Sequence, residues 1–343
     1  MRYTGIIVGL VGVVMVLYSC GKKDAVVSAP IKQEDVTALP LGFPPVPYPA
    51  DNPFTMRKWE LGKKLFYDNV LSVDNSINCG SCHKVSLAFS DDVSKSLGAG
   101  KTVGRRNSPS LANVAYHPYY TREGGVPTLE MQILVPIQEH DEFNFNIVEI
   151  AARLKQVPEY VAMSKEIFGR EPDPYVITRA IATFERTLIS GNSTYDKYLH
   201  QGYTGLLTQA EKRGMNLFYS TRTNCGNCHS GFNFTNYSFE NNGLYEVYAD
   251  NGRERLTGNS ADNALFKVPS LRNIALTAPY MHDGSVATLQ DVIEHYNSGG
   301  KPHPNKSPKV QPLGLTSDEK EDLIAFLQTL TDVEFASNKN LQK

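Results

Sequence analysis

The chain has 343 residues, and its 34 Lys and Arg residues nearly balance its 36 Asp and Glu residues, so the formal charge is −2. This balance argues against a nucleic-acid partner, because no basic tract supplies the charge that phosphate binding needs. The composition is that of a globular protein rather than a disordered or fibrous one, and the length suffices for one large domain or two ordinary ones.

Residues 1–20 have the pattern of an export signal. Arg2 precedes an apolar run of roughly a dozen residues, too short to span a bilayer comfortably but suited to a signal peptide. The run ends in "LYSC", which resembles a bacterial lipoprotein cleavage site with Cys20 as the lipidated residue. An ordinary signal peptide and an uncleaved anchor are the alternatives. We therefore expect an exported protein on the periplasmic side. Only a lipid anchor would hold it to a membrane, and the outer membrane is favoured.

Residues 21–52 are rich in proline and lack helical periodicity, which predicts a tether that ends in the extended segment "PPVPYP". Pro53 is well placed to open the first helix, through "FTMRKWELGKKLFYD". In this segment Trp59, Leu61 and Leu65 supply much of an apolar face.

Four of the five cysteines lie in two copies of one motif, "NCGSCHK" and "NCGNCHS". A disulfide would not need the histidine, no βαβ pattern supports a thioredoxin-like site, and the two motifs are too far apart for a usual zinc site. C-x-x-C-H is the attachment motif of c-type haem, and two copies in an exported chain make the signal strong. We expect two haem c groups, attached and ligated by Cys79, Cys82, His83, Cys225, Cys228 and His229.

The chain is also internally repeated. The segment "PSLANVAYHPYYTREGGVPTLE" from Pro109 matches "PSLRNIALTAPYMHDGSVATLQ" from Pro269 without a gap. Between them, residues 146–190 show the apolar spacing of helices. The predicted fold is mainly α, with two cytochrome c-like haem domains related by internal duplication, at residues 53–200 and 201–343.

The two copies differ at one informative position. Tyr296 of the second copy aligns with Pro136 of the first. A tyrosine can offer an oxygen to iron, whereas proline offers nothing. If both positions face the distal side of their haems, the second iron is six-coordinate and the first has an open site.

These residues give the chain a family resemblance from about Trp59 to Leu330. The motifs "CGSCH", "RRNSPSLANVAY", "GGVPTLEMQ", "CGNCH", "VPSLRNIALTAPYMHDGSVATL" and "HYNSGG" resemble those of the bacterial dihaem cytochrome c peroxidases and their MauG-like relatives. The resemblance implies an N-terminal haem that reacts with hydrogen peroxide, a C-terminal haem that relays electrons, and a calcium ion between them.

The resemblance also implies roles for particular residues. His83 and His229 would be the proximal ligands. Gln132 would orient the peroxide, and Glu142 would act as general acid and base by moving a proton between the peroxide oxygens. Either of these two could instead be an ordinary solvated side chain.

Two further residue sets are implied in the same way. Asn107, Thr277 and Pro279 match the calcium positions, the latter two through backbone carbonyls. Tyr296 sits where family members carry the axial ligand of the second haem. Met281 and His295 compete with it, and His282 is expected to be a packing or hydrogen-bonding residue near the haem.

Two departures from the family pattern concern the first haem and the route between haems. Many members carry a histidine that blocks the first iron, and here that position is Ala99, so we expect an iron that needs no reductive activation. The family's tryptophan between the haems is replaced by Arg122, and Tyr116, Tyr119 or Tyr120 could substitute as a redox-active aromatic.

The sequence thus favours a cytochrome-c peroxidase-type oxidoreductase. Its expected partners are hydrogen peroxide and a small electron donor, a cytochrome c or a cupredoxin. A MauG-like oxidase that modifies a protein or organic substrate is the alternative, and a non-catalytic electron-transfer cytochrome is a weaker one. Relatives are often dimers, so a homodimer is also among the expectations.

Overall fold

The structure is a computed structural model that describes Met1 and residues 31–343. Apart from Met1, the expected signal peptide and its Cys20 lie outside the described residues. Within residues 31–343 no helix is both long and apolar enough to cross a membrane.

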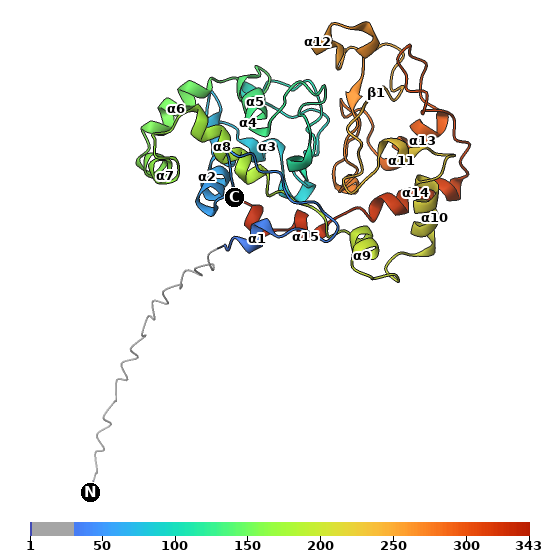
Figure 1. The fold of residues 1–343 in the computed structure, drawn as a ribbon, viewed down its shortest axis with the longest axis horizontal. Helices are drawn as coiled ribbons and strands as arrows, with labels where there is room; N and C mark the ends of the chain where they lie inside the picture. The colour runs from blue at the N-terminus through green and yellow to red at the C-terminus, as the bar shows by residue number, and fades with distance from the viewer. Residues whose placement is uncertain (2–30) are drawn as a thin grey trace. The chain divides into compact units, whose positions relative to one another are not determined.

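The fold is mainly α, as the sequence predicts, and residues 32–343 form one compact unit. Figure 1 shows helices α2 and α8 on one side of this unit and α10 and α14 on the other. The α-helices are α1 (Glu34–Thr37), α2 (Met56–Phe66), α3 (Cys79–Cys82), α4 (Leu129–Gln132), α5 (Leu134–Gln138), α6 (Ile147–Lys155), α7 (Pro158–Phe168), α8 (Pro174–Glu185), α9 (Thr194–His200), α10 (Gln209–Phe218), α11 (Cys225–Cys228), α12 (Glu254–Thr257), α13 (Leu289–Ser298), α14 (Ser317–Gln328) and α15 (Val333–Ala336).

Short elements connect these helices. Strand β1 (Phe239–Glu240) pairs antiparallel with β2 (Phe266–Lys267), with Phe239 opposite Lys267. The 3-10 turns are η1 (Asn69–Leu71), η2 (Val85–Leu87), η3 (Ala99–Lys101), η4 (Val114–Tyr116), η5 (Ser260–Asp262), η6 (Ile274–Leu276) and η7 (Lys339–Leu341).

Helix α2 begins at Met56, three residues later than the expected start at Pro53. The reason is local: the Thr55 side chain accepts a hydrogen bond from the Lys58 N–H, 3.2 Å away, and so caps the helix. The predicted apolar face is buried, with Trp59, Leu61 and Leu65 each 1% exposed.

Each half of the unit is built on one close helix pair. Helix α2 packs on α8, and α10 packs on α14. A Cβ atom on Gly62 of α2 would lie 1.9 Å from the Ala180 carbonyl oxygen, and one on Gly214 of α10 would lie 1.8 Å from the Asp322 carbonyl oxygen. Glycine is therefore required at both crossings, because any side chain would push the helix backbones apart.

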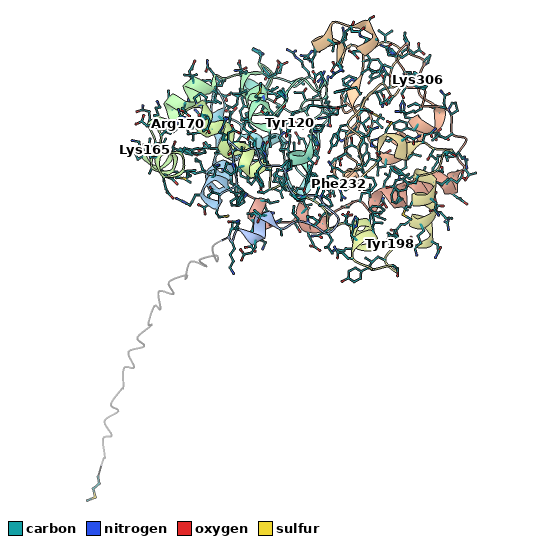
Figure 2. All side chains as sticks on the ribbon, viewed as in Figure 1. Tyr120, Lys165, Arg170, Tyr198, Phe232 and Lys306 are labelled. Atoms are coloured by element: carbon teal, nitrogen blue, oxygen red, sulfur yellow. The ribbon has the colours of Figure 1, made fainter. Side chains whose placement is uncertain are left out.

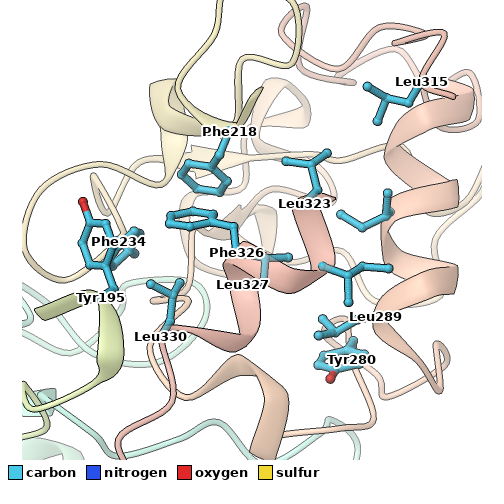
Figure 3. Close-up of a cluster of buried hydrophobic side chains, with 12 residues drawn as sticks. Tyr195, Phe218, Phe234, Tyr280, Leu289, Leu315, Leu323, Phe326, Leu327 and Leu330 are labelled. Carbon is cyan, nitrogen blue, oxygen red and sulfur yellow. The ribbon is translucent and has the colours of Figure 1, made fainter. Parts of the chain in front are cut away.

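The core of the second half surrounds the crossing of α10 and α14. Figure 3 shows aromatic and leucine side chains from α9, α10, α13 and α14 directed toward one another. Phe326 of α14 is fully buried and lies edge-on or tilted to the rings of Tyr195, Phe218 and Phe234. This aromatic packing fixes the helices that flank the second C-x-x-C-H motif.

The sequence repeat recurs as local structure. Asn113 and Asn273 both adopt left-handed backbone conformations, with φ of 60° and 59°. The Asn113 side chain exchanges hydrogen bonds with the Ser190 backbone, and the Asn273 amide donates to the Ser190 hydroxyl. The two repeat copies thus meet at Ser190, on the segment that follows α8.

Part of the stretch expected to be a tether packs against the body. The Phe43 ring contacts the rings of Tyr116 and Phe232, with centroids 6.2 and 4.9 Å away. Asn52 is fully buried, and its amide donates to the Glu130 carboxylate at 2.8 Å. Extended, proline-rich backbone can lie along a surface in this way when its aromatic side chains find partners.

Candidate functional site

The two C-x-x-C-H motifs adopt the same local structure. Helices α3 and α11 each place one cysteine at the start and the other one turn later, so both thiols lie on one helix face. The His83 Nδ1 donates to the Phe89 carbonyl at 2.8 Å, and the His229 Nδ1 to the Phe234 carbonyl at 3.1 Å. These bonds orient the rings and leave each Nε2 lone pair available for a metal.

Burial keeps both imidazoles neutral. It lowers the pKa of His83 and lowers the pKa of His229 to about 4. Neutral imidazole is the form that binds a metal. With paired thiols beside each ring, these residues fit covalent haem c, and they would hold it through two thioethers and one proximal Nε2 at each motif.

A cavity of about 400 Å³ lies against the second motif. Cys225, Cys228 and His229 line it, together with Tyr296. The cavity extends to residues of the first half, among them Gln132. Residues from both halves of the unit therefore line the same cavity.

Backbone hydrogen bonds link several of the residues expected beyond the first motif. Gln132 ends α4, Pro136 lies in α5, and the Pro136 carbonyl accepts from the Phe143 N–H at 3.1 Å. The Ala99 N–H donates to the Glu142 carbonyl at 2.7 Å, which places the residue that cannot ligate beside the candidate acid-base residue. The Gln132 Oε1 is buried and has no hydrogen-bond partner among the described residues, so it fits a role toward a bound molecule.

Glu142 has the titration behaviour of an acid-base residue. The residue is exposed to solvent, yet the protein atoms around the carboxylate disfavour its charge. This desolvation, with Glu139 and Asp141 nearby, raises the pKa of Glu142 to about 7. A group with this pKa can both take up and release a proton near neutral pH.

Tyr296 and Met281, the two main candidates for axial ligand, meet at one side chain. The Asn242 Nδ2 donates to the Tyr296 Oη at 3.4 Å and to the Met281 Sδ at 3.3 Å. The Leu244 N–H donates to the Asn242 Oδ1 at 3.2 Å and so fixes the amide. Asn242 is not predictable from the sequence, because it lies outside the repeated segments and has no counterpart to compare.

The two neighbouring histidines are engaged elsewhere. The His295 Nε2 donates to the Asn242 carbonyl at 3.0 Å, which occupies the nitrogen that a ligand would use. The His282 ring stacks on Phe266 at 4.3 Å between centroids.

The three residues expected to bind calcium all line the cavity. Asn107, Thr277 and Pro279 belong to its wall, and the Asn107 Nδ2 donates to the Val93 carbonyl at 3.2 Å, which leaves Oδ1 free to accept a cation. Within residues 31–343 no three His, Cys, Asp or Glu side chains form a metal cluster. Calcium here would therefore rely on amide and carbonyl oxygens, which this hard ion accepts.

Arg122 and three tyrosines lie where the halves meet. Arg122 and Tyr120 line the cavity, and Figure 2 shows Tyr120 near the middle of the view. Tyr116 packs edge-on against Phe232, and Tyr119 stacks on Phe239 at 5.2 Å between centroids. Of the three tyrosines, Tyr120 alone is both buried and part of the cavity wall.

Comparisons with known proteins agree with this geometry. Residues 56–204 match the family model described as di-haem cytochrome c peroxidase. The methylamine utilization protein MauG of Methylorubrum extorquens is 37% identical, over 89% of this chain and 88% of its own. The chain belongs to the di-haem cytochrome c peroxidase family.

Two further relatives show the breadth of the di-haem peroxidase family. A cytochrome c551 peroxidase of Nitrosomonas europaea is 36% identical over 79% of each chain. The crystal structure of a MauG-like protein associated with microbial copper homeostasis is 36% identical, with a TM-score of 0.83 over 89% of this chain and 98% of that one. The family implies two haem c groups for this chain, and its members include both peroxidases and MauG proteins.

Proposed function

We propose that this protein is a di-haem c peroxidase that reduces hydrogen peroxide to water at the first C-x-x-C-H site. Electrons from a small cytochrome c or cupredoxin would enter through the second site. Two electrons and two protons convert one peroxide molecule into two waters. The haem groups would supply the redox chemistry when bound, attached through the two cysteine pairs and ligated by His83 and His229.

The observation that carries this proposal is the set of residues around Glu142. Ala99 and Pro136 bring no side chain that could ligate a metal, while Gln132 brings a buried amide oxygen without a partner among the described residues. A pure electron carrier gains nothing from such an arrangement. An enzyme that must admit a small molecule and move its protons needs this combination.

The chain's own residues would divide the work. The Gln132 amide would orient the peroxide. Glu142, with a pKa raised to about 7, would take the proton from one peroxide oxygen and deliver it to the other, which becomes water. Their neighbours Ala99 and Pro136 would leave room for the substrate.

The alternative is a MauG-like oxidase that modifies a protein or organic substrate, and Tyr296 favours it. A phenolate donor stabilises the ferric state, whereas a methionine sulfur raises the potential. A second haem with such a ligand would accept electrons from ordinary cytochromes less readily. Both functions would use Glu142 and Gln132 in the same way. They would differ only in the molecule that supplies the electrons.

The test is a peroxide assay on protein that carries two covalent haems, with and without a reduced small cytochrome. The proposal predicts that the cytochrome is oxidised in a two-to-one ratio to peroxide and that the Glu142→Gln variant loses this activity. No cytochrome oxidation, together with peroxide-dependent oxidation of a protein substrate, would favour the oxidase. No reaction with peroxide at all would overturn both functions.

Three remaining elements belong to the same proposal. Calcium would be bound by Asn107, Thr277 and Pro279, and a chelator should then lower the melting temperature. Lipidation at Cys20 would hold the protein on the periplasmic side of a membrane, with the outer membrane favoured. A homodimer stays a prediction from the resemblance.

A further inference from the structure

Two cations face the cavity without an acidic partner. The Arg122 Nη2 donates to the Asn107 carbonyl at 2.7 Å, and the Lys267 Nζ donates to the Tyr119 carbonyl at 2.8 Å. The two residues are adjacent, because the Lys267 N–H donates to the Arg122 carbonyl at 2.7 Å. Both line the cavity, and neither forms an ion pair within residues 31–343.

The neighbouring carboxylates bind other groups. Glu123 lies 2.7 Å from the Arg106 guanidinium, and Asp250 binds the same guanidinium through two bonds of 2.5 and 2.8 Å. Asp283 accepts from the Tyr245 hydroxyl at 2.7 Å. These carboxylates are close enough to attract the pair electrostatically, but none of them forms an ion pair with Arg122 or Lys267 within the described residues.

Two neighbouring cations that are both partly buried are unfavourable without an anion. Desolvation lowers the pKa of Arg122 to about 10 and the pKa of Lys267 to about 8, yet both stay mostly protonated at neutral pH. A buried charge is normally paired, because its lost hydration is otherwise not replaced. The arrangement therefore calls for a bound anion.

His117 adds a third donor to the same wall. Its Nδ1 lies 3.4 Å from the Lys267 Nζ, and an ammonium group can only donate, so Nδ1 must accept and the ring proton sits on Nε2. The His117 Nε2 is buried and has no partner among the described residues. This N–H group needs an acceptor, as the two cations do.

We propose that Arg122 and Lys267, assisted by the His117 Nε2–H, form a pair that would bind propionate carboxylates of haem. The inference rests on the proposed function, since it requires haem at the C-x-x-C-H motifs. Each haem carries two propionate carboxylates, whose charge is opposite to that of the two cations. Calcium at Asn107 would add further positive charge and would increase the need for these anions.

The pair also explains a departure from the family pattern. Arginine stands at the position where the resemblance implies tryptophan. A guanidinium binds carboxylates through a planar fork of donors, which an indole cannot do. The substitution thus replaces an aromatic group between the sites with an anion-binding one.

The test compares Arg122→Met, Lys267→Met and the conservative Arg122→Lys with the wild type. Lys339→Met is the matched control, because Lys339 is exposed and forms no ion pair within the described part of the chain. The readouts are covalent haem content, the propionate bending modes in resonance Raman spectra, and the reduction potentials. The Met variants should keep two haems but shift a propionate mode and lower a reduction potential, because a positive charge is lost. The mode and the potential of Arg122→Lys should lie between those of Arg122→Met and the wild type.

Propionate modes and potentials that match the wild type in both Met variants, at full haem content, would overturn the inference and leave the proposed function intact. Absence of covalent haem from the wild type would instead overturn the proposed function. If Arg122→Met fails to fold, Lys267→Met and Arg122→Lys still decide the question.

Discussion

Glu142 owes its chemistry to its surroundings, because desolvation and the carboxylates of Glu139 and Asp141 raise its pKa to about 7. We expect Glu142→Gln to lower peroxide turnover by about 10²–10⁴-fold, the usual contribution of general acid-base catalysis. In the wild type, turnover should rise with pH through about 7 as the carboxylate forms. Steady-state rates measured across this range check both points.

Glu139→Gln is the matched control for this variant. It removes a nearby negative charge but not the acid-base group, so it should move the midpoint of the pH profile below 7 and keep the rate. Unchanged turnover in Glu142→Gln would remove Glu142 from the mechanism.

The same pKa has a consequence for stability. The folded-state pKa of Glu142 exceeds its ordinary value of 4.5, so the folded state binds more protons than the unfolded state between these values. The contribution of Glu142 to the free energy of unfolding is therefore greatest below pH 4.5 and decreases as pH rises toward 7. Melting temperatures measured across this pH range should therefore show a decrease in the wild type that the Glu142→Gln variant lacks.

Asn242 tests the identity of the axial ligand. If Tyr296 is the ligand, Tyr296→Phe should change the absorption and electron paramagnetic resonance spectra of the second haem, and Met281→Leu should not. Asn242→Ala should give a smaller change of the same kind, because it removes the hydrogen bond to the Tyr296 oxygen. The reverse pattern, with Met281→Leu altering the spectra, would assign the sulfur as ligand.

At the level of single residues, the sequence predicts what local motifs or repeat comparison can reveal. The two C-x-x-C-H motifs and the contrast of Tyr296 with Pro136 belong to this class. Asn242 and Lys267 do not, because their roles arise from contacts with residues far away in the chain, and neither belongs to a motif.

Each half of the molecule depends on one helix crossing, that of α2 with α8 in the first half and that of α10 with α14 in the second. We expect Gly62→Ala and Gly214→Ala each to lower the free energy of unfolding by about 1–3 kcal/mol, the cost of overpacking, because the new methyl group meets backbone oxygen. Gly205→Ala is the control, since a Cβ atom there would meet no described atom within 4 Å. Denaturant unfolding of the three variants provides the measurement.

Equal stability of all three glycine variants would show that the helices can separate without cost. Helix positions follow well from apolar spacing, as the buried face of α2 illustrates. The start of α2 at Met56 depends on a single cap at Thr55, and the close approach at Gly62 depends on a partner more than a hundred residues away. Neither feature is visible in apolar spacing alone.

The whole molecule joins two similar haem-binding motifs with different surroundings. The repeat predicts the fold class, because two copies of one module impose the same helices and turns on both halves. It does not predict the cavity between them, since Arg122, Lys267 and His117 meet only when the halves pack together. Sequence comparison therefore identifies the haem motifs, whereas the structure identifies what surrounds them.

The first iron is expected to be open, and the second is expected to be closed by a protein ligand. Electron paramagnetic resonance of the oxidised, untreated protein with two covalent haems tests this expectation most directly. We expect one high-spin ferric signal and one signal from a six-coordinate iron, with a reaction on adding peroxide that needs no prior reduction. Two six-coordinate irons, each with two strong protein ligands, would contradict it.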